Sequence, residues 1–428
     1  MKIEEFGNNS FQAYIKAERY LNGGSPSGFS DQNTTSEKTR PKSSVHSFPL
    51  YQYKLNGCPI EKYGCNKPDY VLDDYIYIHP DIVPLINESL LYRAKGNELL
   101  VSPTASGRTV ISIEKGFFVK LAYPKQLGRL VRHINSEKII SACEVTSQLI
   151  SVVKSGAQSP YFSFLREDFG QVVLLNPTDI NIQHNSININ GNYELGVLFR
   201  EGTPFPYSKE KEMLIPFFSL FCDNYNSTEK KLDKLLLLQL FEKQDKSIEA
   251  FLLEDVLFPL YSTYFDALLL GGIELEAHAQ NMLIAIDSNY KIKRIVCRDL
   301  ESAGRDALLM EILEIDYRND IPYKLNTLSD ELNGQKYPKY YITHSFMFDF
   351  KLGEYIVTPL LDKVQKHLQY NRDKVIKSIK DYNRQYINRL PQGFFTDDWC
   401  RYENVNWEKD GKTREYLWSA DPKYRWVD

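Results

Sequence analysis

The stretch GGIELEAHAQNMLIAIDSNYKIKRIVCRDLES, residues 271–302, joins two apolar runs to a dense set of polar side chains. The runs MLIAID and IKRIVC flank the polar turn SNYK, and this pattern predicts a β-hairpin with buried strands. A hairpin brings its two ends together, so Asn281 and Asp299 are predicted to be neighbours at its open end. The stretch therefore predicts a polar cluster held in place by a buried pair of strands.

Three further polar residues precede the first strand. In a helix, Glu276 and His278 would point in roughly opposite directions, whereas in an extended segment Glu276, His278 and Gln280 share one face. Kinase-like folds use an Asn and an Asp in such positions to hold Mg²⁺ against nucleotide phosphates. We therefore predict that these residues line a binding site for a nucleotide and a metal ion. The competing interpretation is that these residues only support the fold, because a histidine beside apolar strands is usually a core residue with its hydrogen bonds made inside the protein.

A second constellation lies in SPTASGRTVISIEKGFFVKLAYPKQLGRLVRHI, residues 102–134. Its apolar runs flank the turn EKG and predict another hairpin, in which Lys120 lies opposite Thr109 or Val110 and beside Arg108. Two cations with hydroxyl donors between them suit a triphosphate, because arginine offers a bidentate fork and lysine a point charge. We predict that these cations act on ATP and not on folding; the alternative is a solvated basic hairpin.

Composition narrows the classes of partner. The chain has 428 residues, a formal net charge of −4 and 43% hydrophobic residues, as in ordinary globular proteins. This balance gives no general attraction to nucleic acid or to an anionic membrane surface. The six cysteines form no CxxC pair, and no signal peptide or long apolar span is present. We therefore expect a cytoplasmic protein with no nucleic-acid or membrane partner.

The pattern along the chain predicts three regions. Residues 1–45 read as an N-terminal arm that is partly disordered, because residues 22–44 are rich in Gly, Ser, Asn, Thr and Pro. Residues 46–225 alternate apolar and polar positions between turn signals, which predicts a β-rich region carrying the phosphate-binding hairpin. In residues 226–428 the apolar residues recur at helical spacing, which predicts a helical region that contains the hairpin of residues 282–297.

Four blocks, in order, give the chain a family resemblance. They are IYIHP, SPTASGRTV, FFVKLAYPKQLGRLVR and the pair GIELEAHAQN and RDLES. With these blocks, the chain from about residue 75 to about residue 305 resembles the siderophore synthetases that work without a nonribosomal peptide synthetase, the aerobactin synthetase (IucA/IucC) family. The last pair of blocks is the most specific part of the resemblance.

The resemblance implies an α+β, multi-lobed thumb, fingers and palm architecture with a β-rich N-terminal half and a helix-rich, distantly kinase-like palm. It implies ATP-dependent condensation of a carboxylic acid, citrate or a related acid, with an amine or hydroxyl through an acyl-adenylate. The catalytic residues it implies are His278, Arg132 and Lys120. Those implied to bind ATP are Ser106, Arg108, Thr109, Lys120, Gln280 and Asn281, and those implied to hold Mg²⁺ are Asn281, Asp299 and Glu301. Family analogy also suggests a homodimer.

Two departures from the family pattern keep other functions open. The histidine-rich block that helps hold the acid in family members is reduced here to EKTR, residues 37–40, and the HP block continues as HPDI, residues 79–82. A nucleotide-binding regulatory protein without catalysis is therefore one alternative. A small-molecule phosphotransferase is another, but Gln280 stands where its catalytic aspartate would be expected, and a glutamine cannot accept the hydroxyl proton.

Overall fold

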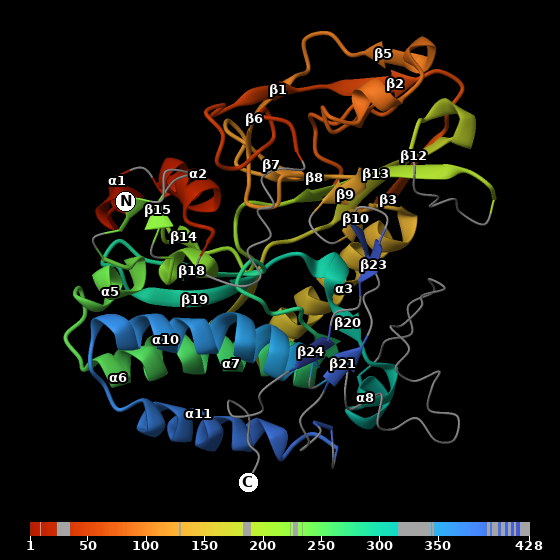
Figure 1. Cartoon of the computed structure of the whole chain (residues 1–428). Coiled ribbons are helices and arrows are strands. Elements are labelled where there is room, and N and C mark those ends of the chain that lie inside the picture. Colours follow the sequence, from red (N-terminus) through yellow and green to blue (C-terminus); the bar gives the residue numbers. More distant parts are fainter. Residues whose placement is uncertain are drawn as a thin grey trace.

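The computed structural model describes residues 1–8, 10–23, 35–127, 130–182, 190–222, 224–225, 230–232, 234–315, 344, 346–391, 394–395, 401–403, 407–409, 412–414 and 417–419. Figure 1 shows a β-sheet lobe above a lobe built mainly from helices. The described part is therefore α+β, as predicted from the sequence.

The upper lobe is organised by a seven-stranded antiparallel sheet. In spatial order its strands are β1 (Phe48–Leu50), β6 (Leu99–Pro103), β7 (Thr109–Ser112), β8 (Phe118–Leu121), β13 (Tyr193–Arg200), β12 (Phe169–Leu175) and β3 (Ile60–Gly64). A smaller sheet has the order β4 (Ile76–Tyr77), β2 (Gln52–Leu55) and β5 (Leu91–Arg93), and β9 (Tyr123–Leu127) pairs with β10 (Leu130–Arg132). Short 3₁₀ turns η1 (Val83–Leu85), η2 (Glu88–Leu90) and η3 (Pro177–Asp179) join these strands.

The lower lobe begins with a four-stranded mixed sheet. Its order is β11 (Phe162–Phe164), β19 (Ile292–Cys297), β18 (Met282–Ile286) and β14 (Met213–Pro216), with only β11 and β19 parallel. The hairpin predicted over residues 282–297 is confirmed, with Met282 opposite Cys297. Short pairs are β15 (Asn224–Tyr225) with β16 (Lys230–Lys231), β17 (Ile273–Glu274) with β20 (Gly304–Arg305), β21 (Arg401–Glu403) with β24 (Leu417–Ser419), and β22 (Trp407–Lys409) with β23 (Lys412–Arg414).

Helices lie beneath and beside this sheet (Figure 1). They are α1 (Glu4–Asn8), α2 (Ser10–Tyr20), α3 (Ser136–Ser155), α4 (Phe217–Leu220), α5 (Leu236–Phe241), α6 (Ile248–Ala250), α7 (Phe258–Gly271), α8 (Ala307–Ile312), α10 (Thr358–His367) and α11 (Arg372–Ile387), with π-helical segments η4 (Phe251–Leu257) and η7 (Phe346–Val357). Helix α3 contacts both lobes, because it packs on β3, β12 and β13 and also on α7. Its ends are defined by Asn135, which caps the Lys138 N–H, and by Gly156 in the left-handed region. None of the described helices combines the length and apolar character needed to cross a bilayer.

The first 21 residues differ from the predicted arm. Ile3, Phe6, Ala17 and Leu21 are fully buried in the same core cluster as the strands and helices of the lower lobe. Helix α2 also packs on β14. The physical reason is an apolar stripe at helical spacing, which buries enough surface to order the segment. Residues 24–34, the centre of the stretch predicted to be disordered, lie outside the described residues.

A buried histidine links two parts of the lower lobe. The Nδ1 atom of His344 lies 2.7 Å from a carboxylate oxygen of Glu274, and its Nε2 atom lies 2.8 Å from a carboxylate oxygen of Asp306. Although burial disfavours the charged ring, the two carboxylates raise the pKa of His344 to about 9. His344 is therefore a cation at neutral pH.

Replacing His344 with Gln should remove a pH-dependent part of the stability. A histidine pKa that is raised on folding stabilises fully below the ordinary value near 6.5, and this contribution disappears as the pH rises through about 9. We expect a loss of roughly 1.5–3 kcal/mol at pH 6.5, typical of buried hydrogen bonds to charged groups, and a much smaller difference above pH 9. Urea unfolding at several pH values measures this, and a difference independent of pH would contradict it.

Candidate functional site

The polar stretch before β18 folds as tight turns and not as an extended segment. The Ala277 N–H donates to the Leu275 carbonyl at 2.8 Å, and the His278 N–H donates to the Glu276 carbonyl at 2.9 Å. The Asn281 N–H then donates to the His278 carbonyl at 2.8 Å. The predicted period-2 arrangement of Glu276, His278 and Gln280 is therefore wrong, because local hydrogen bonds satisfy these backbone groups in place of a neighbouring strand.

The open end of the hairpin brings the predicted segments together. The Arg298 N–H donates to the Asn281 carbonyl at 2.9 Å, so Asp299 follows directly after the last paired residue. Asp299 has φ of 69°, a left-handed conformation that Asp tolerates better than most residues. The chain then forms the 3₁₀ turn η5 (Leu300–Ser302), which carries Glu301.

The turn between β6 and β7 holds the predicted phosphate-binding residues. The Ser106 hydroxyl accepts the Thr109 N–H at 2.9 Å, and the Thr104 hydroxyl donates to the Thr109 carbonyl at 2.8 Å. Gly107 has φ of 72°, which explains a glycine at the tip of this turn. His79 Nδ1 accepts the Asp81 N–H, so its Nε2–H donates to the Gly107 carbonyl at 3.2 Å. The side chains of Ser106 and Thr109 thus form part of the turn that presents Arg108.

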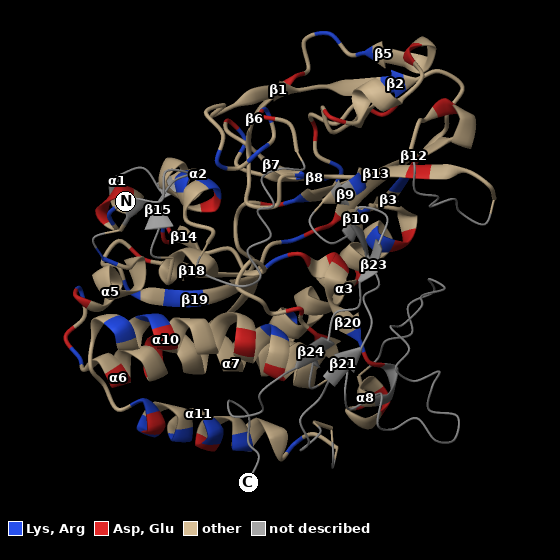
Figure 2. Ribbon diagram, viewed as in Figure 1, with Lys and Arg blue, Asp and Glu red and all other residues tan. Residues whose placement is uncertain are grey.

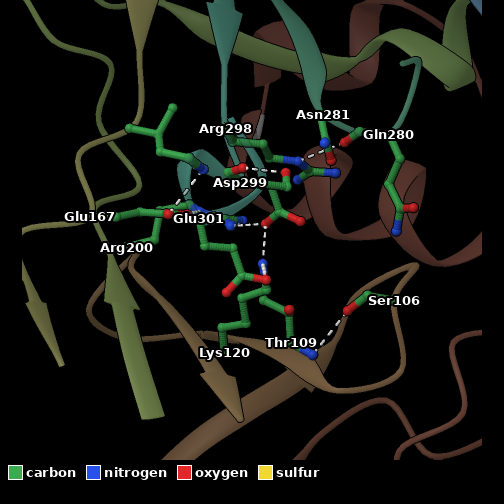
Figure 3. A network of polar contacts seen from close by, with 12 residues as sticks. Ser106, Thr109, Lys120, Glu167, Arg200, Gln280, Asn281, Arg298, Asp299 and Glu301 are labelled. Carbon is green, nitrogen blue, oxygen red and sulfur yellow. Dashed lines mark hydrogen bonds and ion pairs between the residues drawn. The ribbon is translucent and has the colours of Figure 1, made fainter. Parts of the chain in front are cut away.

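Lys120 reaches the hairpin end from the neighbouring strand. The register places Thr109 opposite Lys120, one of the two predicted alternatives, Thr109 and Val110. The Lys120 ammonium lies 2.8 Å from Asp299 Oδ1 and 2.9 Å from Glu301 Oε1, and Arg108 Nη2 lies 3.3 Å from Glu301 Oε1. Figure 3 shows Lys120 and Thr109 approaching Asp299 and Glu301 from the β-sheet lobe. Cations predicted for phosphate and carboxylates predicted for Mg²⁺ therefore contact each other.

Two charged residues in this network escaped prediction from the sequence. Arg200 forms an ion pair with Asp299, and its Nε lies 2.5 Å from Glu167 Oε1. The other Glu167 carboxylate oxygen accepts the Leu300 N–H at 3.0 Å. Glu167 therefore fixes both Arg200 and the turn that carries Glu301. We define the ion-pair cluster as Arg108, Lys120, Glu167, Arg200, Asp299 and Glu301. Figure 3 labels all of these residues except Arg108.

Both carboxylates at the centre of the cluster are ionised. Burial alone would raise their pKa values, but Lys120 and Arg200 hold the pKa of Asp299 well below its usual range. In the same way, Lys120 and Arg108 lower the pKa of Glu301 to about 2. The Asp299 side chain is 28% exposed, whereas that of Glu301 is 6% exposed. Asp299 is therefore the carboxylate of the pair that is more accessible to a ligand.

Further cations border the cluster. Burial and the charge of Arg108 lower the pKa of Arg132, and nearby carboxylates partly offset this lowering. The Arg132 carbonyl accepts a weak hydrogen bond from Arg108 at 3.4 Å. Lys138, at the start of α3, has a pKa lowered by burial and by three neighbouring cations, while Glu301 raises it. Lys138 was not predicted, although Asn135, its helix cap, is a visible signal in the sequence.

His278 is a neutral, oriented imidazole. Burial lowers its pKa to about 4, more than the adjacent Glu276 can raise it. Its Nδ1 accepts the Gln280 N–H at 3.2 Å, so the proton lies on Nε2, 3.9 Å from a Glu276 oxygen. Glu276 in turn accepts a hydrogen bond from Lys351 at 2.6 Å, a second contact that the sequence did not predict. His278 can therefore donate a hydrogen bond to a ligand at neutral pH.

Asn281 and Gln280 have structural contacts near the hairpin end. The Asn281 amide donates to the Glu276 carbonyl at 3.1 Å, and the Gln280 carbonyl accepts the Arg298 Nε–H at 2.8 Å. In Figure 3 both residues lie on the opposite side of Asp299 from Glu167. Their predicted roles in nucleotide and Mg²⁺ binding stay predictions.

The chain resembles known proteins in sequence and in fold. The model of the IucA / IucC family matches residues 75–222, which confirms the resemblance inferred from the sequence blocks in this range. No curated protein sequence matches the chain.

Solved structures share the fold at low identity. The petrobactin biosynthesis protein AsbB from Bacillus anthracis str. Sterne is 14% identical with a TM-score of 0.63, covering 98% of this chain and 77% of its own. ATP-bound aerobactin synthetase IucA from a hypervirulent pathotype of Klebsiella pneumoniae is 12% identical with a TM-score of 0.59, covering 91% and 73%. Aerobactin synthetase IucC from the same pathotype is 13% identical with a TM-score of 0.55, covering 86% and 68%. The chain therefore has the fold of these synthetases.

Proposed function

We propose that this protein is an ATP-dependent siderophore-synthetase-like ligase that condenses a carboxylic acid, citrate or a related acid, with an amine or hydroxyl group. The proposal rests on one observation. Arg108 and Lys120 form ion pairs with Asp299 and Glu301 at the end of a buried hairpin. The family match over residues 75–222 supports the same reaction class. ATP is the expected second substrate, since the similar synthetase IucA was solved with ATP bound.

The proposed reaction has two steps. A carboxylate oxygen of the acid attacks the α-phosphorus of ATP, the bond to pyrophosphate breaks, and an acyl-adenylate and pyrophosphate form. An amine or hydroxyl then attacks the acyl carbon, and AMP leaves. Arg108, Lys120 and Arg132 supply positive charge near the phosphates, where negative charge builds in the transition state. His278 donates a hydrogen bond from Nε2, consistent with its neutral imidazole.

The residues present fit a magnesium ion. Asp299 and Glu301 are ionised neighbours, and Glu301 Oε2 is buried with no hydrogen-bond partner among the described residues. Mg²⁺ is usually held by one or two carboxylates together with substrate phosphates, and no group of three or more ligands occurs in the part of the chain described. Asp299 and Glu301, with Asn281 beside them, would hold the ion, which would neutralise phosphate charge when bound.

The ion-pair cluster also explains how the site remains stable without ligand. Arg108, Lys120 and Arg200 balance Glu167, Asp299 and Glu301, so three positive charges meet three negative ones. A nucleotide with Mg²⁺ brings its own charges of both signs and can exchange partners with the cluster. We further propose that the protein acts in the cytoplasm on small molecules, and that a homodimer is its working form.

Product analysis tests this function directly. The full chain is incubated with ATP, Mg²⁺ and a panel of carboxylic acids including citrate, with hydroxylamine present to trap activated acid as hydroxamate. AMP, pyrophosphate and acid-dependent hydroxamate are the expected products. ADP would identify a phosphotransferase, and tight ATP binding without turnover would identify a regulatory protein; either result would refute the ligase proposal.

A further inference from the structure

A large cavity lies beside α2, outside the ion-pair cluster. Its volume is about 620 Å³, within the range of roughly 300–1,000 Å³ found for small-molecule sites. One face of α2 lines it, with Gln12, Ile15, Lys16 and Arg19, and the segment of residues 42–47 lines the other wall. Ser102 of β6 and Ile113 also line it. Figure 1 shows α2 at the boundary between the two lobes, near this part of the sheet.

The described lining of this cavity carries positive charge and no carboxylate. Lys16, Arg19 and Lys42 contribute three cations. The hydroxyls of Ser43 and Ser44 already donate to the Val45 carbonyl and to Glu37, so Ser47 and Ser102 supply the hydroxyl donors. Lys16 has Glu5 as an ion-pair partner at 3.2 Å, but Lys42 is half-buried and forms no ion pair with any described residue. For a protein of net charge −4, such a local excess of cations favours an anionic ligand.

Arg19 builds the wall of the cavity. Its guanidinium donates hydrogen bonds to the carbonyl groups of Pro41, Ser43 and Val45 at 2.9, 3.0 and 2.8 Å, and also to that of His46. These bonds fix the 41–46 segment against α2, so the cavity is preformed. Because the guanidinium N–H groups have carbonyl partners, Arg19 offers charge to a ligand while Lys42, Ser47 and Ser102 offer donors.

Ser102 adds an independent sign of a ligand. Its side chain is fully buried, and its hydroxyl has no hydrogen-bond partner in the described part of the chain. Ser102 lies opposite Ile111, and Ile111 packs with Tyr14 and Ile15, so this face of the sheet is turned toward α2. An unpaired buried hydroxyl costs about 1–3 kcal/mol, and a ligand that accepts its hydrogen bond would recover this cost.

We propose that this cavity binds a small polyanion, a molecule carrying several carboxylates or phosphates, at a site separate from the ion-pair cluster. The site does not rest on the proposed ligase function. It is joined to the cluster through α2, because Glu18 accepts the Ala105 N–H at 3.3 Å and pairs with Arg298. Arg298 immediately precedes Asp299, so α2 contributes both to the wall of the cavity and to contacts beside the cluster.

The test uses calorimetric titration of the full chain with citrate and, separately, with inorganic pyrophosphate, against sodium chloride of equal ionic strength. The two probes distinguish a carboxylate ligand from a phosphate ligand. Saturable binding of at least one probe at millimolar concentration is expected. Ser102→Ala should weaken it about tenfold or more, as loss of a hydrogen bond to a charged group predicts, and Lys42→Met should weaken it similarly.

Ser102→Ala separates a ligand role from a structural one. Because it removes an unpaired buried hydroxyl, the unliganded variant should be no less stable than the parent protein. A destabilised variant would assign Ser102 to the fold and overturn the inference. The matched control Lys366→Met removes an exposed lysine of α10 and should leave the affinity unchanged.

A variant of the ion-pair cluster shows whether the anion binds in the cavity or at the cluster. Arg108→Gln, in the ion-pair cluster, should leave intact the part of the binding that Ser102→Ala and Lys42→Met weaken. Three results would overturn the proposal: no saturable binding of either probe, equal weakening by Lys366→Met, or binding that survives both cavity variants and disappears in Arg108→Gln.

Discussion

Asp299→Asn is expected to lower turnover by about 10² to 10³ while changing ATP affinity far less, the usual cost of losing one electrostatic contact in a transition state. The substitution keeps the shape of the side chain and removes its charge. Asp299 is the most accessible carboxylate of the cluster, with its side chain 28% exposed, and its lowered pKa keeps it ionised at neutral pH. Its charge therefore matters most when phosphate charge is redistributed.

Pyrophosphate release, followed while Mg²⁺ is titrated, measures this effect. The variant should need more Mg²⁺ for half-maximal rate as well as turning over more slowly. Asp287→Asn, at the turn end of the same hairpin, is the matched control, because Asp287 accepts only local backbone hydrogen bonds in its turn among the described residues. An Asp299→Asn enzyme with an unaltered rate and Mg²⁺ requirement would remove the physical basis of the proposed site.

Local pattern was enough to predict both hairpins. In each, apolar strands flank a short polar turn, and the turn limits the register to neighbouring alternatives. This placed Lys120 opposite Thr109 or Val110, of which the structure has Thr109, and it placed Asp299 at the open end beside Asn281. The prediction of an extended segment before β18 was wrong, because local hydrogen bonds form tight turns at Ala277 and His278.

Tertiary contacts could not be predicted in this way. Arg200 and Asp299 are 99 residues apart in sequence, and Glu18 and Arg298 are 280 apart. No spacing rule relates such residues, so Arg200 and Glu18 carried no signal of their role. The burial of α2 did carry a signal, since Ala13, Ala17 and Leu21 recur at helical spacing.

The burial of Lys120 also changes what its loss should do. The sequence predicted that the phosphate-facing cations act on ATP and not on folding, but Lys120 is 2% exposed and lies between two ionised carboxylates. Removing one partner of a buried ion pair leaves charge uncompensated and costs about 3–5 kcal/mol. Lys120→Met is therefore expected to lower the free energy of unfolding by this amount, measured by urea denaturation at pH 7.

A surface ion pair supplies the control for this loss. Lys62 Nζ lies 2.9 Å from Asp73 Oδ1, nearly the same distance as in the Lys120 pairs, but Lys62 is 37% exposed. Exposed pairs contribute about 0–1 kcal/mol, so Lys62→Met should have little effect. The double variant Lys120→Met/Glu301→Gln should be less destabilised than the sum of its single changes by about 0.5–3 kcal/mol, the coupling expected for residues in contact.

The pH dependence identifies the origin of the loss. Glu301 has its pKa lowered from 4.5 to about 2, so its ion pairs stabilise the folded protein fully above pH 4.5, and this stabilisation is lost as the pH falls toward 2. Without Lys120 the pKa of Glu301 is lowered less, so the difference in stability between the parent protein and Lys120→Met should shrink through this acidic range. A difference that stays constant from pH 7 to pH 2 would show that lost packing and not charge pairing explains the role of Lys120 in folding. A loss no larger than that of Lys62→Met would show that Lys120 does not stabilise the fold.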